Sequence, residues 1–249
     1  TTGSDTRGPG GVRFFAFHHA GGSKALYQGW RSRLPTSWDV RLMDAPGRGT
    51  LFGQPQIDDL GRLVEHFLTR VEDELDGPYA FFGHSMGGLV AAELTHRLLA
   101  EGRTRPVWLG LSSCRAPGTR PSVPRYTLSD EELRRSVAEL GGTPAVVLED
   151  PTLWEVFGPI IRADLRVVEA PRPRHAQPLT VPVTVFGGRD DESVPQEQLT
   201  AWTGCCTDFR GLRLFEGGHF YFSDDPGPLV EHVVRDVTAA LDAVPDPSR

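Results

Sequence analysis

Short apolar runs alternate with longer segments of mixed character along this 249-residue chain. The runs match buried strands, because a strand covered on both faces of a sheet has few polar positions. In the segments between them, apolar residues recur every three or four positions, which predicts amphipathic helices. The predicted strands are residues 12–17, 39–43, 79–83, 106–112, 181–186 and 212–215, and the predicted helices are 57–75, 86–100 and 226–243. This alternation indicates an α/β fold with a mostly parallel central sheet flanked by helices.

The pentapeptide Gly83-His-Ser-Met-Gly87 lies where the third predicted strand meets the helix 86–100. It has the form G-x-S-x-G of a nucleophile elbow, a tight turn that exposes a serine hydroxyl to a base. The pattern alone is weak, since a chain with 28 glycines contains it by chance roughly one time in five. Its position between a strand and a helix makes Ser85 the candidate nucleophile of a serine hydrolase.

Carboxylate and imidazole side chains follow later in the chain, each just beyond a predicted strand. Asp190 and Asp191 lie in the glycine-rich turn after residues 181–186, and His219 follows residues 212–215. An enzyme of the α/β-hydrolase fold presents its triad in the chain order Ser, Asp, His. The order and the strand-end positions in this chain agree with that requirement.

The three residue types can share the work of acyl transfer. We expect Ser85 to attack the substrate and His219 to take and return the proton, while an aspartate orients the imidazole and stabilises its charged form. Asp191 is preferred to Asp190 because of its place in the turn Gly188-x-x-Asp-x-x-Val-Pro195. The alternative, Asp190, remains open at this point.

An oxyanion hole needs two backbone N–H groups close to the nucleophile. Met86, the residue after the serine, is expected to supply one of them. The loop after the strand 12–17 is rich in glycine, which lets the backbone approach a ligand closely, and Ala20 in this loop is the candidate for the other. His18 and His19 in the same loop either touch substrate or have a structural role.

The segment between the strands 106–112 and 181–186 is too long for one crossover helix. It carries helical patterns at 129–140 and 151–168 and is predicted to form a helical lid over about residues 115–172. Its second pattern has more apolar residues than one helix face needs for packing: Leu153, Trp154, Val156, Phe157, Ile160 and Ile161. An apolar lid favours a fatty or polyketide-like acyl group as substrate. A helix pair that simply packs on the body is the alternative.

Length and composition are consistent with one domain over residues 12–244. A chain with 39% apolar residues can bury one sizeable core. Residues 1–11 and 245–249 are rich in Gly, Pro and polar residues, and are expected to be flexible tails. A net charge of −7 and the lack of an aromatic-studded basic patch argue against a nucleic-acid partner.

No apolar stretch in the sequence approaches the length of a transmembrane helix, and the polar N-terminus does not resemble a secretory signal. We therefore expect a cytoplasmic protein with no membrane partner, whose cysteines Cys114, Cys205 and Cys206 are reduced. Neither H-E-x-x-H nor C-x-x-C occurs, so neither a metal nor a cofactor is expected. His84 is expected to pack beside the nucleophile.

Several segments of the chain carry motifs that occur together in one family. They are Phe17-His-His-Ala-Gly-Gly-Ser23, Ala45-Pro-Gly-Arg-Gly49, Phe82-Gly-His-Ser-Met-Gly-Gly88, Leu128-Ser-Asp-Glu-Glu-Leu133, Leu140-Gly-Gly-Thr-Pro144, Pro159-Ile-Ile-Arg-Ala-Asp164 and Gly217-Gly-His-Phe-Tyr221. From about residue 12 to residue 240, the chain resembles the type II, or editing, thioesterases that accompany polyketide synthases and nonribosomal peptide synthetases. Pro-Gly-Arg-Gly and Arg-Ala-Asp are more selective than the elbow itself.

The resemblance implies an α/β-hydrolase that removes acyl groups from the phosphopantetheine arm of an acyl or peptidyl carrier protein, clearing stalled or wrongly primed chains. It assigns the triad to Ser85, Asp191 and His219 and the oxyanion hole to Ala20 and Met86, without a cofactor. We expect a monomer. A carboxylesterase or an acyltransferase would use the same triad, so both remain alternatives.

The chain departs from the family in two places. His18 stands where the family usually has proline, and Pro171-Arg-Pro-Arg174 replaces a segment that usually contains tyrosine. Carrier proteins of these systems are generally acidic, so local arginines are needed for docking on a chain of net negative charge. The candidates are Arg120, Arg125, Arg172 and Arg174, for which a merely solvated role is the alternative.

Overall fold

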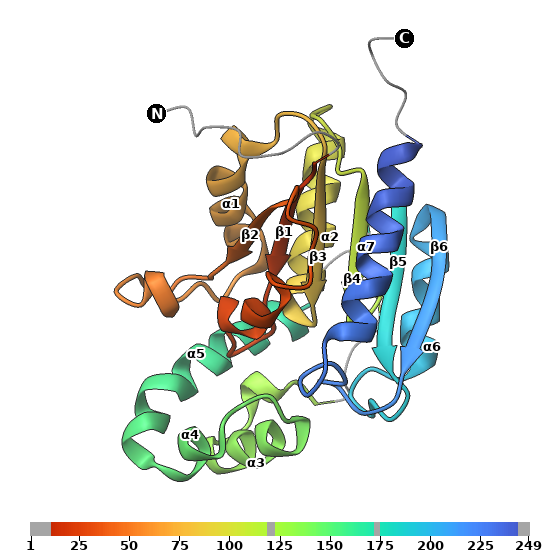
Figure 1. The fold of residues 1–249 in the computed structure, drawn as a ribbon. Helices are drawn as coiled ribbons and strands as arrows, with labels where there is room; N and C mark the ends of the chain where they lie inside the picture. The colour runs from red at the N-terminus through yellow and green to blue at the C-terminus, as the bar shows by residue number, and fades with distance from the viewer. Residues whose placement is uncertain (1–10, 119–122, 172–174, 244–249) are drawn as a thin grey trace.

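A parallel sheet with the strand order β2-β1-β3-β4-β5-β6 forms the centre of the molecule (Figure 1). The computed structural model describes residues 11–118, 123–171 and 175–243, so the predicted tails lie outside the described residues except for Gly11. Over these residues the strands are β1 (Arg13–Phe17), β2 (Asp39–Met43), β3 (Tyr79–His84), β4 (Trp108–Ser112), β5 (Leu179–Gly188) and β6 (Cys206–Phe215). Every neighbouring pair is parallel, which confirms the predicted fold class and places all carboxyl ends along one edge.

The strand predictions fail most at β6. Residues 212–215 were expected, but the strand begins at Cys206. Its first half carries polar residues such as Asp208 and Arg210, because β6 lies at the edge of the sheet, pairs with β5 alone, and has mostly half-buried or exposed residues. A bulge in the β5–β6 pairing before Gly211 interrupts the regular alternation further.

The helices that flank the sheet fall within the segments predicted for them. They are α1 (Leu60–Val71), α2 (Met86–Ala100) and α7 (Gly227–Asp242). The N-terminus of α1 is later than expected because Asp59 is its cap and accepts a hydrogen bond from the Arg62 N–H (2.9 Å). Shorter elements were not predicted: α4 (Ala145–Glu149), α6 (Gln196–Thr200), η1 (Lys24–Trp30), η2 (Gly49–Leu51), η3 (Glu72–Glu74), η4 (Arg125–Thr127) and η5 (Ala201–Gly204).

The sheet buries a separate apolar cluster on each face. Phe14 and Phe82 point to the face covered by α7, where they join Val233 in one cluster. Phe15 follows Phe14 in β1, and Phe81 precedes Phe82 in β3. Both belong to the opposite cluster, with α1 and α2. Successive side chains of a strand alternate between the faces, so strands buried on both sides read as continuous apolar runs.

The segment between β4 and β5 forms a group of helices beyond the carboxyl ends of the strands (Figure 1). It contains α3 (Asp130–Leu140), α4 and α5 (Pro151–Glu169). The α3 helix begins with a capping box made by Ser129 and Glu132. These helices have a small core of their own, which we call the lid core: Leu133, Val137, Trp154, Ile161 and Leu165.

The apolar run at the start of α5 is used mostly for packing. Trp154, Ile160 and Ile161 are buried, whereas Val156 is 40% exposed. Near the end of α5, Val167 joins the main core on the α2 side of the sheet. The helix group therefore covers the strand ends and also packs on the sheet and its flanking helices, which we call the body. No helix of the described residues has the length and hydrophobicity that crossing a membrane requires.

Candidate active site

Ser85 occupies the sharp turn between β3 and α2. Its backbone angles are φ 55° and ψ −113°, a region that L-residues rarely adopt and that functional sites often retain. A side chain at Gly83 would place its Cβ 2.0 Å from the Gly87 carbonyl oxygen, and one at Gly87 would come within 1.9 Å of the Phe17 carbonyl oxygen. Gly83 is therefore needed for the tight turn of the elbow itself, and Gly87 for its packing against the end of β1.

The turns after β5 and β6 bring an aspartate and a histidine together. The His219 Nδ1–H donates to Asp191 Oδ2 at 2.8 Å, and both side chains are buried. The neighbouring Asp190 has an exposed side chain, and only its backbone N–H faces this turn, donating to the Gly217 carbonyl (3.0 Å). Of the two adjacent aspartates, Asp191 is therefore the one in contact with the imidazole.

Hydrogen bonds keep the Asp191 carboxylate charged. Its Oδ1 accepts from the N–H groups of Ser193 and Val194, both at 3.0 Å, and from the Ser193 hydroxyl at 2.6 Å. Burial alone raises the pKa of this carboxyl, but the hydrogen bonds from His219, Ser193 and Val194 hold the pKa below its ordinary value. Ser193 Oγ also lies 3.0 Å from His219 Nδ1. No sequence motif singled out Ser193, because its role depends on how the turn folds back.

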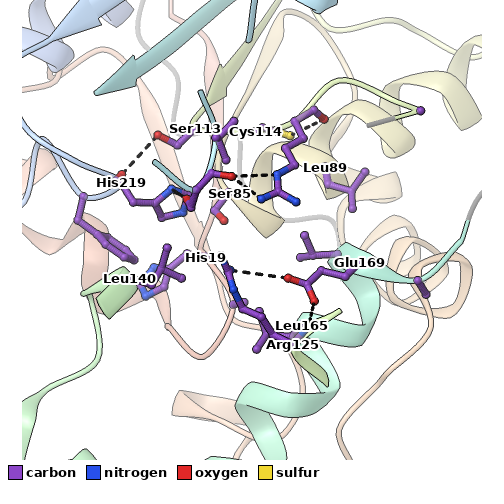
Figure 2. Close-up of a pocket in the computed structure, with 18 residues that line it drawn as sticks. His19, Ser85, Leu89, Ser113, Cys114, Arg125, Leu140, Leu165, Glu169 and His219 are labelled. Carbon is purple, nitrogen blue, oxygen red and sulfur yellow. Dashed lines mark hydrogen bonds and ion pairs between the residues drawn. The ribbon is translucent and has the colours of Figure 1, made fainter. Parts of the chain in front are cut away.

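Ser85 and His219 line the same pocket, between the strand ends and the lid helices (Figure 2). The cavity volume is about 50 Å³. Apolar side chains from both layers enclose it: Leu89, Leu140, Leu165, Val168, Val194 and Phe220. The helices between β4 and β5 therefore restrict the space beside the serine.

Two backbone N–H groups are available beside Ser85. Met86 is the first residue of α2, so its N–H has no intrahelical acceptor. Ala20 also lines the pocket, and no group of the described residues accepts a hydrogen bond from its N–H. The geometry is compatible with the oxyanion hole predicted from the sequence.

His18 braces the loop that carries Ala20. Its Nε2 accepts a hydrogen bond from the Ala45 N–H (3.1 Å), so its Nδ1 carries the proton and donates to the His19 carbonyl oxygen at 2.7 Å. That carbonyl belongs to the same peptide unit as the Ala20 N–H. The structure thus favours the structural alternative for His18, and the histidine ties the loop to the turn after β2.

Burial keeps His18, His19 and His84 neutral. Burial, together with the nearby Arg48 guanidinium, lowers the pKa of His18 to about 4. The pKa values of His19 and His84 are also well below the ordinary value, mainly because of burial and then because of neighbouring histidines. The His84 ring packs 5.1 Å from that of His219 and hydrogen bonds with Ser112 (2.9 Å), which agrees with the expected packing role.

A buried ion pair joins the loop to the lid. Arg48, from the turn after β2, pairs with Asp164 of α5 through two N–H groups, one of which lies 2.8 Å from Oδ1. Asp164 Oδ2 also accepts from the Gly21 N–H at 2.7 Å. Arg48 lies in the Pro-Gly-Arg-Gly motif and Asp164 in the Arg-Ala-Asp motif. The two residues are 116 positions apart in the sequence, so no local pattern indicates that they are in contact.

Charged groups also reach the pocket from the lid side. Glu169 is buried and accepts a hydrogen bond from the Arg125 N–H (2.6 Å), and the Arg125 guanidinium lies 3.7 Å from the same carboxylate (Figure 2). Burial raises the pKa of Glu169 despite this contact. Arg125 is therefore largely enclosed rather than free on the surface. The other docking candidates, Arg120, Arg172 and Arg174, lie outside the described residues.

The fold and this site agree with the comparison to known families. The model of the thioesterase domain family matches residues 13–241. The chain belongs to the thioesterase domain family, as the resemblance in its motifs predicted. The prediction of a hydrolase acting on thioesters is thereby confirmed.

Several similar proteins come from biosynthetic systems. The gramicidin S biosynthesis protein GrsT of Aneurinibacillus migulanus is 27% identical over 231 residues, which cover 92% of this chain and 90% of the relative. ClbQ from the colibactin NRPS/PKS pathway has a similar structure, with a TM-score of 0.85 and 32% identity over 94% of this chain and all of that chain. The type II thioesterase BorB from the borrelidin biosynthetic cluster has a TM-score of 0.83 and 29% identity, covering 94% of this chain and 95% of its own.

Proposed function

We propose that this protein is a type II thioesterase that hydrolyses acyl groups from the phosphopantetheine arm of an acyl or peptidyl carrier protein in polyketide or nonribosomal peptide biosynthesis. Such a reaction would clear stalled or wrongly primed chains from the carrier. The relatives from NRPS/PKS and related pathways support this role. The observation that carries it is the strained Ser85 elbow, which lines one pocket with His219, whose ring is hydrogen bonded to Asp191.

The proposed mechanism has two steps. Ser85 Oγ attacks the thioester carbonyl carbon while His219 takes the hydroxyl proton, and the N–H groups of Ala20 and Met86 stabilise the tetrahedral oxyanion. The C–S bond then breaks, and the pantetheine thiol leaves with the proton from His219. Water repeats the attack on the acyl-serine, giving the free acid and restoring Ser85. Asp191 holds the imidazole in one tautomer throughout.

The size of the pocket limits the acyl group. A cavity of about 50 Å³ has room for a few water molecules, so in this conformation it accommodates a short acyl group. The fatty or polyketide-like chain expected from the apolar lid would require α3 and α5 to move. We therefore infer that short acyl groups are the preferred substrates.

We place the protein in the cytoplasm, as a monomer whose partner is the carrier protein and not a nucleic acid. Arg125 is paired with Glu169 inside the pocket, so we assign it to contacts with the acyl-pantetheine rather than to docking of the carrier surface. The adjoining hollow beside His219 is lined by four carboxylates, Glu139, Asp190, Asp191 and Glu192, and by one cation, Arg125. An acidic carrier is therefore expected to dock away from this hollow.

The test compares hydrolysis of one acyl group from a loaded carrier protein, from a pantetheine mimic and from an oxygen ester. We expect the carrier-bound thioester to react fastest and Ser85→Ala to abolish turnover. Asp191→Asn should lower kcat by about 10⁴-fold because the amide no longer holds the imidazole in the required tautomer. Its matched control, Asp190→Asn, should leave kcat nearly unchanged, since the Asp190 side chain is exposed.

The other outcomes separate the alternatives. Equal rates on the oxygen ester and the carrier-bound thioester would identify a general carboxylesterase. Transfer of the acyl group to an added alcohol or amine in preference to water would identify an acyltransferase. Equal activity of Asp191→Asn and wild type would remove Asp191 from the proposed triad.

A further inference from the structure

The Arg48–Asp164 pair is more enclosed than a stabilising surface pair would be. Both side chains are almost fully buried, with exposed fractions of 5% and 1%. Burying two charges is costly, and an apolar pair of similar volume is often as stable or more stable. Stability alone is therefore a poor explanation for the pair, and the other contacts of the carboxylate indicate its role.

The Asp164 carboxylate fixes one of the two peptide units that flank Ala20. Its Oδ2 accepts from the Gly21 N–H at 2.7 Å, and this N–H belongs to the peptide unit between Ala20 and Gly21. The other unit, between His19 and Ala20, is fixed at its carbonyl by the Gly22 N–H (3.1 Å) and the His18 ring (2.7 Å). With both units held, the direction of the Ala20 N–H is determined.

Arg48 holds the carboxylate in place and contacts the same loop. Besides its two bonds to Asp164, the guanidinium donates to the Pro46 carbonyl (3.1 Å) and to the Gly22 carbonyl (3.5 Å). The planar fork of arginine fixes both carboxylate oxygens in one orientation. Asp164 therefore has little freedom to rotate away from Gly21.

Apolar contacts place α5 against the loop independently of the charges. A side chain at Gly21, whose φ is +75°, would place its Cβ 2.8 Å from Ile161 Cγ1. Ala20 itself packs against the lid core, which includes Ile161 and Leu165. Ile161, Asp164 and Leu165 share one face of α5, since residues three and four apart are neighbours on a helix.

From these contacts we propose that Asp164, held by Arg48, is a positioning residue for the oxyanion hole, so that the Ala20 N–H is correctly aimed only when α5 is in place. The inference rests on the function proposed above for the Ala20 and Met86 N–H groups. Its physical consequence is that the lid helix does more than cover the pocket. A displacement of α5 would therefore also weaken the stabilisation of the transition state.

Two double variants separate positioning from packing. Arg48→Met with Asp164→Asn removes both charges but keeps a carbonyl oxygen that can accept from the Gly21 N–H. Arg48→Met with Asp164→Leu removes the charges and the acceptor together. We expect both to fold, and we expect kcat of the leucine variant to be about 100-fold below that of the asparagine variant, with KM changed far less. The affinity of an alkyl boronic acid, which forms a tetrahedral adduct on Ser85, should fall in parallel.

A matched control comes from the same helix. Arg166 of α5 forms an exposed pair with Asp58 (2.9 Å), which also links the helix to the body but does not contact the loop. Arg166→Met should leave kcat and boronic acid affinity unchanged. Equal kcat values for the two double variants would overturn the proposal, because the pair would then be only a packing element.

A measurement on the wild type covers the case in which a double variant does not fold. The Gly21 amide should exchange its hydrogen at least about 100-fold more slowly than the amide of Gly61, because a partly buried hydrogen bond to Asp164 protects it. Gly61 is exposed and lies in the first turn of α1, where its N–H has no intrahelical acceptor. Similar exchange of the two amides would contradict the proposal. All kinetic comparisons can also be made with an aryl ester, so a wild type inactive on carrier-bound thioesters would reject the proposed function without deciding this inference.

Discussion

Hydrogen bonds and burial decide the protonation of single residues around Ser85. Asp191 is held as the carboxylate by three donors besides His219, and His18 is held neutral with its proton on Nδ1. Both states suit the proposed chemistry, since a charged carboxylate stabilises the imidazolium and a neutral His18 can accept from the Ala45 N–H. The same burial makes these residues sensitive to acid.

His18 is expected to reduce stability at low pH. Its pKa is about 4 in the folded protein and 6.5 in the unfolded chain, so the unfolded state binds the proton first as pH falls. Above pH 6.5 the ring is neutral in both states and the free energy of unfolding is unaffected. Between pH 6.5 and pH 4 the free energy of unfolding falls by about 3 kcal/mol. His18→Asn should reduce the slope of the free energy of unfolding between these values by about 1.4 kcal/mol per pH unit.

Urea unfolding followed by tryptophan fluorescence at a series of pH values measures this slope. At pH 8 the His18 ring is neutral in the folded and the unfolded wild type. The difference in free energy of unfolding between wild type and His18→Asn at this pH therefore measures the contacts that the substitution removes. An unchanged slope in His18→Asn would show that the ring does not remain neutral on folding.

The elements depend on backbone approaches that side chains would prevent. The first turn of α2 packs against the end of β1 so closely that the Gly87 position has backbone atoms of Phe17 and His18 as its nearest neighbours. This contact brings the Met86 N–H and the Ala20 loop to the same side of Ser85. Similarly, Gly188 in β5 has the Gly217 and Gly218 carbonyls as neighbours, which brings the two turns of the Asp191–His219 pair together.

Gly87→Ala is expected to destabilise the fold strongly. The added Cβ would lie 1.9 Å from the Phe17 carbonyl oxygen, and only a backbone shift could relieve that overlap. We expect a loss of about 3 kcal/mol or more in the free energy of unfolding and a large loss of esterase activity. The control, Gly29→Ala, has no atom within 4 Å of the new Cβ and should change stability by less than about 0.5 kcal/mol. A stable, active Gly87→Ala protein would contradict the close packing at the elbow.

Across the whole molecule, the sheet and its flanking helices supply the proposed reacting groups, and the helices between β4 and β5 limit the pocket. The body contributes Ser85 and His219, while α3 and α5 contribute Leu140 and Leu165 on the opposite side. Because α5 has residues in both the lid core and the main core, the lid is anchored at that end. The space beside the serine is consequently small.

Chain-length preference tests this arrangement. We expect kcat/KM for a propionyl thioester to exceed that for a dodecanoyl thioester, because the cavity volume is about 50 Å³. Leu140→Ala should enlarge the pocket and improve kcat/KM of a hexanoyl relative to a propionyl substrate by about 10-fold. Substrate series on a common pantetheine carrier would measure both effects. Faster reaction of the dodecanoyl thioester in the wild type would mean that the lid opens during turnover.

The sequence by itself determined the features that depend on which residues neighbour one another along the chain. Strands buried on both faces require apolar runs, and the elbow, the acid turn and the histidine turn follow such runs directly, so Ser85, Asp191 and His219 could be proposed as partners. Helices α2 and α7 were found to within a residue or so because their apolar spacing is regular. The first half of β6 was missed, since an edge strand needs no apolar run.

Only the tertiary structure decided how distant segments meet. It brought Asp191 rather than Asp190 to the imidazole, added Ser193 to the same network, and placed His18 as a brace for the Ala20 loop. It also joined Arg48, in the turn after β2, to Asp164 of α5. These contacts are decided by the angles of turns and by the packing of α5 on the body, which are not encoded in the periodicity of any one segment. Sequence patterns record which face of an element is buried, whereas the partner that covers it depends on the folded chain as a whole.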